Sequence, residues 1–198
     1  TVKLSGYYLG ATEVTQEQYY NITGESPSLH GPGANLPVEK VSWEDAVAFC
    51  KKLTEQEKAA GRLPSGYAYV LPTEAEWENA CRAGTTGDYA GDLDAMGWYN
   101  KNSGSKTHKV GGKRANAWGF YDMHGNVWEW CWDRYGDYDA GDTENPEGAD
   151  SGSARVVRGG SWSGLASDCR SAFRFRLPPD ARLNNQGFRV ALSSRREP

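Results

Sequence analysis

The residues best suited to metal or redox chemistry are four cysteines and three histidines. Cys50, Cys81, Cys131 and Cys169 are 31, 50 and 38 positions apart, so they form no Cys-x-x-Cys pair, and no histidine stands at a zinc-site spacing. Four cysteines in 198 residues are also too few for a disulfide scaffold. The histidines lie far apart, and no Ser/His/Asp spacing or carboxylate pair is distinctive. The pattern therefore predicts neither a zinc site nor a recognisable catalytic set.

Three helices are expected to position part of this set. Thr15 and Ser42 are the N-caps of two of them, and the apolar face of the second includes Cys50. Thr73 caps the third helix, whose buried stripe includes Cys81. Both of these cysteines are therefore predicted to be buried free thiols. Strands are expected at residues 4–14, 67–71, 127–132, 156–162, 169–177 and 187–192, with a long loop over 85–117.

The composition favours one soluble domain that spans residues 1–198. Only 38% of the residues are hydrophobic, but 12% are aromatic, so a few bulky side chains must form the core. A net charge of -4 argues against a nucleic-acid partner. No apolar run approaches the roughly 20 residues that a transmembrane segment requires.

Charge is unevenly distributed along the chain. Seven acidic residues and one arginine lie between Asp133 and Asp150, whereas residues 155–198 carry nine arginines, no lysine and three acids. Such an acidic run predicts a solvated loop, and a cation site is the alternative.

The segment over residues 155–192 is the most informative part of the chain. From Cys169 to Leu177 the side chains alternate, with Phe173 and Phe175 on one side and arginines on the other. Alternation of this kind predicts a strand, and by itself it places the two phenyl rings on the core face.

Six short motifs follow one another in order along nearly the whole chain. They are Glu13-Val14-Thr15, Pro37-Val38-Glu39-Lys40-Val41-Ser42-Trp43, Leu71-Pro72-Thr73-Glu74-Ala75-Glu76-Trp77, Gly125-Asn126-Val127-Trp128-Glu129-Trp130, Arg158-Gly159-Gly160-Ser161-Trp162 and Gly187-Phe188-Arg189. This set resembles the formylglycine-generating enzyme family, also called the sulfatase-modifying factor family. The resemblance implies an α+β, C-type-lectin-like fold with two main helices, small twisted antiparallel sheets and a high loop content.

The resemblance also shows what this chain lacks. In members that oxidise a substrate cysteine to formylglycine, two cysteines five positions apart hold copper for oxygen activation. The second of these positions corresponds to Cys169 here, but the first corresponds to Gly164. Because a lone thiolate lacks the paired soft ligands that select Cu(I), we expect no copper and no enzyme of this kind. A divergent copper oxidase that uses Cys169 with another ligand is the alternative.

The same family fold is used without catalysis by the variable proteins of diversity-generating retroelements, which present a variable ligand-binding surface near the C-terminus. The terminal segment resembles theirs, because fixed-looking residues alternate with positions where the family usually has Asn. The predicted ligand-binding residues are Trp162, Ser163, Gly164, Leu165, Ser167, Asp168, Phe173, Phe175, Leu177, Pro178, Ala181 and Leu183. If the arginines brace the sheet, the apolar members of this set are expected to face solvent as a binding patch.

The stretch from Asp122 to Glu129 resembles the calcium loop of the family. The resemblance implies ligands from Asp122, the carbonyls of Gly125 and Val127, and Glu129, and oxygen ligands from one loop suit Ca²⁺. The alternative is that Glu129 pairs with an arginine while Asp122 caps a turn. His124 is expected to be a turn residue with a satisfied ring rather than a base.

Three functions remain open on this basis. The first is a non-enzymatic ligand-binding protein with a variable C-terminal surface, whose partner is a protein or another macromolecular surface. The second is the copper oxidase named above, and the third is a structural interaction domain of a larger surface or signalling protein. An extracellular, cell-surface or virion location is favoured over a cytoplasmic one, and the oligomeric state is open.

Overall fold

The three predicted helices form where their capping residues place them. The computed structural model describes residues 1–138, 141, 143–196 and 198. Helices α1 (Gln16–Thr23), α2 (Trp43–Ala59) and α3 (Glu74–Arg82) each follow a Thr or Ser whose hydroxyl accepts the N3 backbone N–H. The N3 side chain accepts the cap's own N–H in return, which completes a capping box in all three. A short helix α4 (Leu93–Met96) and a 3-10 turn η1 (Ala166–Cys169) were not predicted.

The strands are short and form three small sheets. They are β1 (Val2–Lys3), β2 (Tyr8–Leu9), β3 (Ala68–Val70), β4 (Trp128–Arg134), β5 (Thr143–Glu144), β6 (Arg155–Arg158), β7 (Arg174–Leu177), β8 (Gln186–Gly187) and β9 (Ala191–Ser193). The described sheets have the orders β1-β5, β2-β9-β3 and β7-β6-β4-β8. Most pairs are antiparallel as expected, but β1 with β5 and β4 with β8 are parallel.

Three predicted strands are wrong over much of their length. The predicted strand 187–192 is divided into β8 and β9, which belong to different sheets, and 188–190 lie outside both. Only residues 174–177 of the predicted strand 169–177 pair with β6. Before them, the N–H of Phe173 donates to Arg170 O in a turn, and the N–H of Ser171 donates to Asp88 O in a distant loop, so neither group takes part in a strand ladder. Within predicted strand 4–14, only β2 lies in a described sheet, beside β9.

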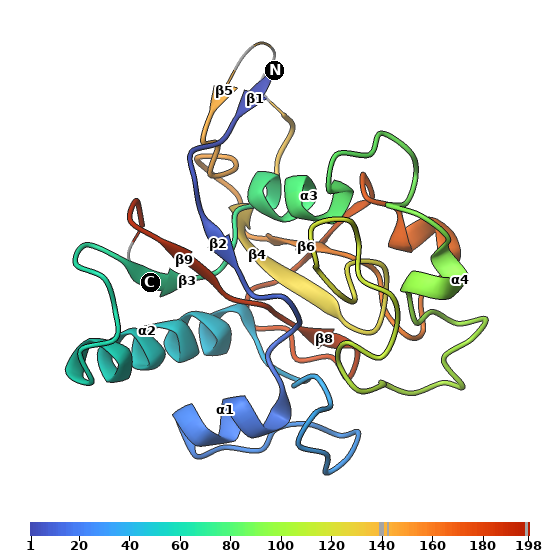
Figure 1. Ribbon diagram of the computed structural model, residues 1–198, viewed down its shortest axis with the longest axis horizontal. Helices are drawn as coiled ribbons and strands as arrows, with labels where there is room; N and C mark the ends of the chain where they lie inside the picture. The colour runs from blue at the N-terminus through green and yellow to red at the C-terminus, as the bar shows by residue number, and fades with distance from the viewer. Residues whose placement is uncertain (139–140, 142, 197) are drawn as a thin grey trace.

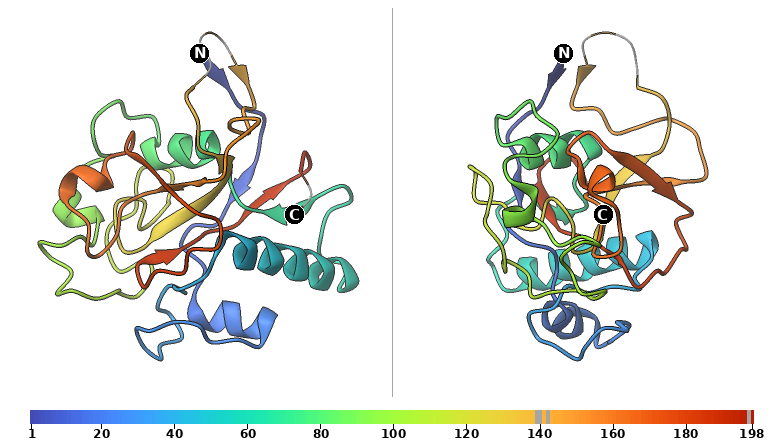
Figure 2. Two further views of the ribbon diagram at one scale, coloured as in Figure 1. Left: turned by 180° about the vertical axis from the view of Figure 1, so that it is seen from behind. Right: turned by 90° about the vertical axis from the view of Figure 1, so that its right-hand side faces the viewer.

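The helices lie on two sides of the strands (Figure 1). Helices α1 and α2 contact each other on one side, and α2 also packs on β3, whereas α3 packs on β4 and β6. Figure 2 shows the C-terminal third of the chain, from orange to red, running beside β4 in both views. This part of the chain therefore supplies neighbours on both edges of β4.

Aromatic side chains fill the core, as the composition predicts. Trp130 and Trp77 are fully buried, and Phe188 stacks edge-on against Phe49 with ring centroids 5.3 Å apart. All four cysteines are buried and free, which confirms the prediction for Cys50 and Cys81. Within the described residues, no helix has the length and apolar character that a bilayer span requires.

Candidate functional site

The predicted ligand-binding residues lie on and around η1, β7 and the loop that follows β7. None of the twelve is buried. The exposed members are Ser163, Leu165, Ser167, Phe175, Pro178 and Leu183, and the half-buried members are Trp162, Gly164, Asp168, Phe173, Leu177 and Ala181. The site is therefore a surface, which we call the C-terminal surface, and its twelve residues define it.

Its apolar members divide into an exposed group and a packed group. Leu165, Phe175 and Leu183 expose 59%, 47% and 42% of their area. Phe173 and Leu177 instead pack against the main core cluster. The sequence predicts that five apolar residues face water, namely Leu165, Phe173, Phe175, Leu177 and Leu183. This expectation is wrong for two of them, because Phe173, just before β7, and Leu177, at its end, are half-buried against the core.

Polar and aromatic contacts join the separate stretches of this surface. Asn185 donates from Nδ2 to Ser163 Oγ at 3.0 Å, and its carbonyl accepts the N–H of Trp128 at 2.8 Å. The Trp128 ring lies 6.0 Å from Phe173 and 5.8 Å from Phe175, measured between ring centroids. The loop after Trp162 and the strand β7 are therefore connected through two residues that sequence reasoning did not select.

The sequence explains why Trp128 and Asn185 were not selected. The pattern of β4 predicts that Trp128 is a core residue, and it is only 9% exposed. Asn185 lies beyond Leu183, the last of the positions that the sequence comparison singled out. A search for amides next to the divergent positions would have found it.

Arginines from the C-terminal segment fix this surface to the rest of the protein. Arg158 is fully buried and contacts Glu74 at 3.2 Å and Glu78 at 2.5 Å. It also donates to the carbonyls of residues 171 and 172, just before β7. Arg174 donates to both carboxylate oxygens of Glu74, and Arg182 does the same with Asp45. The Arg158 and Arg174 pairs are largely buried and help to hold the backbone in one geometry, whereas the Arg182–Asp45 pair is exposed and adds little.

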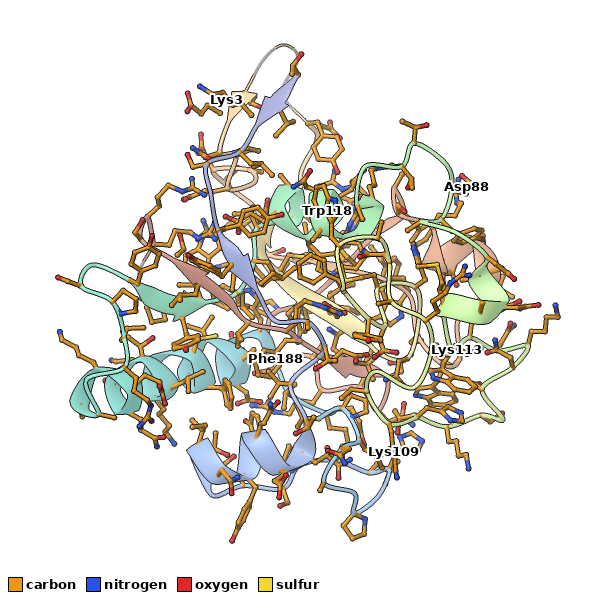
Figure 3. The ribbon with its side chains drawn as sticks, viewed as in Figure 1. Lys3, Asp88, Lys109, Lys113, Trp118 and Phe188 are labelled. Carbon is orange, nitrogen blue, oxygen red and sulfur yellow. The ribbon has the colours of Figure 1, made fainter. Side chains whose placement is uncertain are left out.

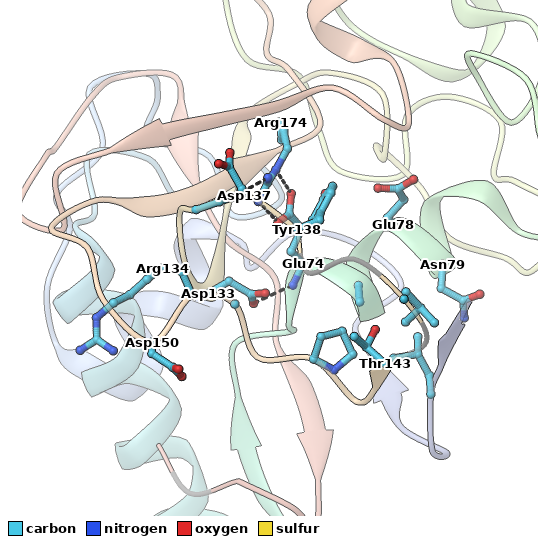
Figure 4. Close-up of a pocket in the computed structure, with 18 of the residues that line it drawn as sticks. Glu74, Glu78, Asn79, Asp133, Arg134, Asp137, Tyr138, Thr143, Asp150 and Arg174 are labelled. Carbon is cyan, nitrogen blue, oxygen red and sulfur yellow. Dashed lines mark hydrogen bonds and ion pairs between the residues drawn. The ribbon is translucent and has the colours of Figure 1, made fainter.

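The acidic run after β4 borders a pocket of about 870 Å³ beside α3 (Figure 4). Its residues Asp137, Glu144, Glu147 and Asp150 are exposed, as a solvated loop predicts, whereas Asp139 and Asp142 lie outside the described residues. Asp133 differs, because it is buried and accepts the backbone N–H at position 74. Burial raises the pKa of Asp133 to about 7, although the N–H that it accepts opposes this rise.

Cys169 lies beneath this surface rather than on it. Its side chain is 0% exposed, and burial raises the pKa of its thiol to about 12. His124 braces the same turn: its Nδ1 is 2.8 Å from the Cys169 carbonyl, and its Nε2 accepts the N–H of Ala90 at 3.1 Å. Both ring nitrogens are therefore satisfied, which confirms the structural interpretation of His124. Burial lowers the pKa of His124, as suits a neutral ring.

These residues do not fit a copper centre. No group of three or more His, Cys, Asp or Glu side chains gathers as a metal site among the described residues. A buried thiol with a raised pKa is also a poor source of the thiolate that binds soft metals.

The predicted calcium loop is occupied by an ion pair. Arg189 donates to both oxygens of Glu129 at 2.6 and 2.7 Å, and the indole N–H of Trp77 donates to Oε2 at 2.7 Å. Asp122 Oδ2 accepts the Gly111 N–H. This geometry matches the arginine-pairing alternative for Glu129, and calcium binding stays a prediction.

The other two predicted calcium-loop residues, Gly125 and Val127, have structural roles. Gly125 has φ +130°, and a Cβ at this position would lie 2.2 Å from the Trp98 carbonyl oxygen. Only glycine allows the two chain segments to approach so closely. Val127 is fully buried. Glu13 lies nearby, buried and with neither carboxylate oxygen hydrogen-bonded, and burial together with Asp122 raises its pKa well above the usual range.

The fold and this surface define a C-type-lectin-like α+β domain. A profile of the sulfatase-modifying factor enzyme 1-like domain matches residues 1–194, and the chain belongs to this family. It is 30% identical to the chaperone protein LppX of Paenibacillus barcinonensis, over 97% of this chain and 82% of that protein. It is 36% identical to the formylglycine-generating enzyme of Mus musculus, over 84% of this chain but 46% of the enzyme, so it spans less than half of that relative.

Solved structures support the same assignment. Treponema denticola variable protein 1 has a TM-score of 0.90 and 36% identity, over 96% of this chain and 86% of that one. The Major Tropism Determinant U1 variant has a TM-score of 0.56 at 15% identity, over 93% and 50% of the two chains, and shares the fold alone. The predicted fold class is confirmed. The relatives include both enzymes and a variable protein.

Proposed function

We propose that this chain is a non-catalytic ligand-binding protein that presents the C-terminal surface to a protein or another macromolecular partner. The observation that carries the proposal is the exposure of Leu165, Phe175 and Leu183 above a framework of buried arginine–carboxylate pairs. Large apolar side chains on a rigid support provide contact area at a low entropic cost. In this proposal the chain acts as the variable protein of a diversity-generating retroelement.

The loss of the family's cysteine pair supports a binding role over an oxidase. Gly164 stands at the first position and is half-buried, and the remaining thiol of Cys169 is shielded from solvent. The 36% identity to a solved variable protein is consistent with the same role. A copper oxidase is the second candidate, and the 36% identity to a formylglycine-generating enzyme favours it.

The proposal is tested with two libraries of the chain displayed on a surface. The first randomises the six exposed residues of the C-terminal surface together. The control randomises exposed apolar residues elsewhere, namely Val2, Tyr8, Tyr20, Leu29 and Trp118. Both libraries are selected against one purified protein target. We expect the first library to keep its fold and yield specific binders more often than the control, and equal yields would contradict the proposal.

Two measurements separate the candidates. The gene is examined for a nearby near-copy of its 3′ segment that differs only at adenines, beside a reverse transcriptase. The purified chain is also titrated with Cu(I) against a chelator and assayed for formylglycine on a cysteine peptide. Stoichiometric copper that is lost in Cys169→Ser, together with formylglycine formation, would establish the oxidase instead.

A further inference from the structure

A second pocket, with a mostly apolar lining, lies outside the C-terminal surface, in the loop between α4 and β4. It has a volume of about 420 Å³ and is lined by Leu36, Trp98, Lys106, Thr107, His108, Lys109 and Gly112. Trp98 and Leu36 supply apolar walls, and the His108 ring stacks on Trp98 with centroids 3.8 Å apart at 10°. The stack holds the indole in one orientation.

Two buried hydrogen-bonding groups of this pocket have no partner within the described part of the chain. They are the indole Nε1 of Trp98 and the hydroxyl of Thr107, and Thr107 is only 4% exposed. Nε1 can only donate, and the hydroxyl can donate as well. Buried donors are rarely left unpaired, so both point to an acceptor that the chain itself does not provide.

Up to Tyr121, the charged residues of this loop are all basic, and Asp122 follows them. Residues 95–121 carry Lys101, Lys106, Lys109, Lys113 and Arg114 and no acidic residue, in a chain whose net charge is negative. Lys106 and Lys109 are exposed and form no ion pair with any described residue, whereas Lys101 pairs with Asp94. Lys113 places its Nζ 4.2 Å from the centre of the Trp98 ring. Figure 3 shows Lys109 and Lys113 on the same side of the molecule, far from Lys3.

We infer that this pocket binds a tetrahedral oxyanion, the phosphate or sulfate group of a small ligand. Trp98 Nε1 and the Thr107 hydroxyl donate to its oxygens, and Lys106 and Lys109 neutralise its charge. The oxygens of such a group accept hydrogen bonds from the indole N–H and from the hydroxyl, and lysine is a usual point-charge partner of phosphate. This inference does not rest on the function proposed for the C-terminal surface.

The loop is also joined to that surface. The side chain of Asn126 accepts the His108 N–H at 2.9 Å, and its backbone N–H donates to Trp98 O at 2.8 Å. The carbonyl of Asn126 accepts the N–H of Trp162 at 2.8 Å. Asn126 therefore links the pocket residues Trp98 and His108 directly to Trp162 of the C-terminal surface.

The test follows the indole N–H signals of the eight tryptophans by two-dimensional ¹H–¹⁵N NMR. Trp98→Phe assigns the signal of interest in the full chain. Inorganic phosphate and inorganic sulfate are titrated separately, with sodium chloride at matched ionic strength as the control. We expect a saturable shift of the Trp98 signal with an oxyanion and none with chloride. Saturation by one oxyanion only would identify which group the pocket accepts.

Two variants measure the contributions of the named groups. The double variant Lys106→Gln, Lys109→Gln is expected to raise the Kd about ten-fold, because it removes both unpaired charges. The matched control is Lys51→Gln, Lys52→Gln, two exposed lysines on α2, and we expect it to leave the Kd unchanged. Thr107→Val keeps the side-chain size but removes the donor, so it is also expected to weaken binding. A Trp98 signal that stays fixed or follows chloride equally, or a lysine double variant with the wild-type Kd, would overturn the inference.

Discussion

The sharpest test of the C-terminal surface compares two phenylalanines in different environments. Phe175 lies on β7 and exposes 47% of its area, whereas Phe188 is fully buried in the main core cluster. Complete burial of such a side chain stabilises a protein by about 1.5–3 kcal/mol, so the buried half of Phe175 contributes roughly 0.8–1.6 kcal/mol. Phe188→Ala removes the full contribution and leaves a cavity, at a cost of about 3–5 kcal/mol.

The assay is urea denaturation of the two alanine variants and the parent chain, followed by tryptophan fluorescence. We expect Phe175→Ala to lower the free energy of unfolding by less than half of the loss in Phe188→Ala, with similar m-values in all three. Equal losses would show that Phe175 is a core residue. In that case the C-terminal surface would lose its central aromatic contact.

Three further predictions follow from buried groups. Because the pKa of Asp133 is raised to about 7, protonation favours the folded state, and stability falls as pH rises from about 4 to about 7. Asp133→Asn should flatten this part of the stability–pH curve, which chemical denaturation at several pH values measures. Arg189→Met should cost about 3–5 kcal/mol in the same assay, because Glu129 stays buried without its partner, and a loss below 1 kcal/mol would contradict this. Gly125→Ala should greatly lower the thermal midpoint, since its Cβ would clash with the Trp98 carbonyl, whereas an unchanged midpoint would refute the close approach.

Local signals in the sequence were sufficient for the helices. The caps Thr15, Ser42 and Thr73 mark the start of each helix because a capping box needs only residues three positions apart. The apolar periods of α2 and α3 likewise identified Cys50 and Cys81 as buried. Such features depend on neighbours along the chain, so they are visible without coordinates.

The strand at 169–177 shows where local signals fail. Its alternation is real, but the Phe173 N–H bonds in a turn to position 170, and the Ser171 N–H bonds to position 88 in another loop. Phe175 and Phe173 share a side of the alternating pattern, yet one is exposed and the other packs on the core. Whether a side chain is buried depends on which other parts of the fold pack against it. The periodicity of the sequence does not contain this information.

By itself the sequence determined the family, the helix starts and the stretch of chain that forms the C-terminal surface, because all of these are written in short motifs and their order. Only the tertiary structure decided which partner each buried charge takes. Glu129 pairs with Arg189, 60 residues further along the chain, and Glu74 pairs with Arg174, 100 residues away. Ion pairs form between groups that folding brings within a few ångströms, and neither composition nor spacing encodes that proximity.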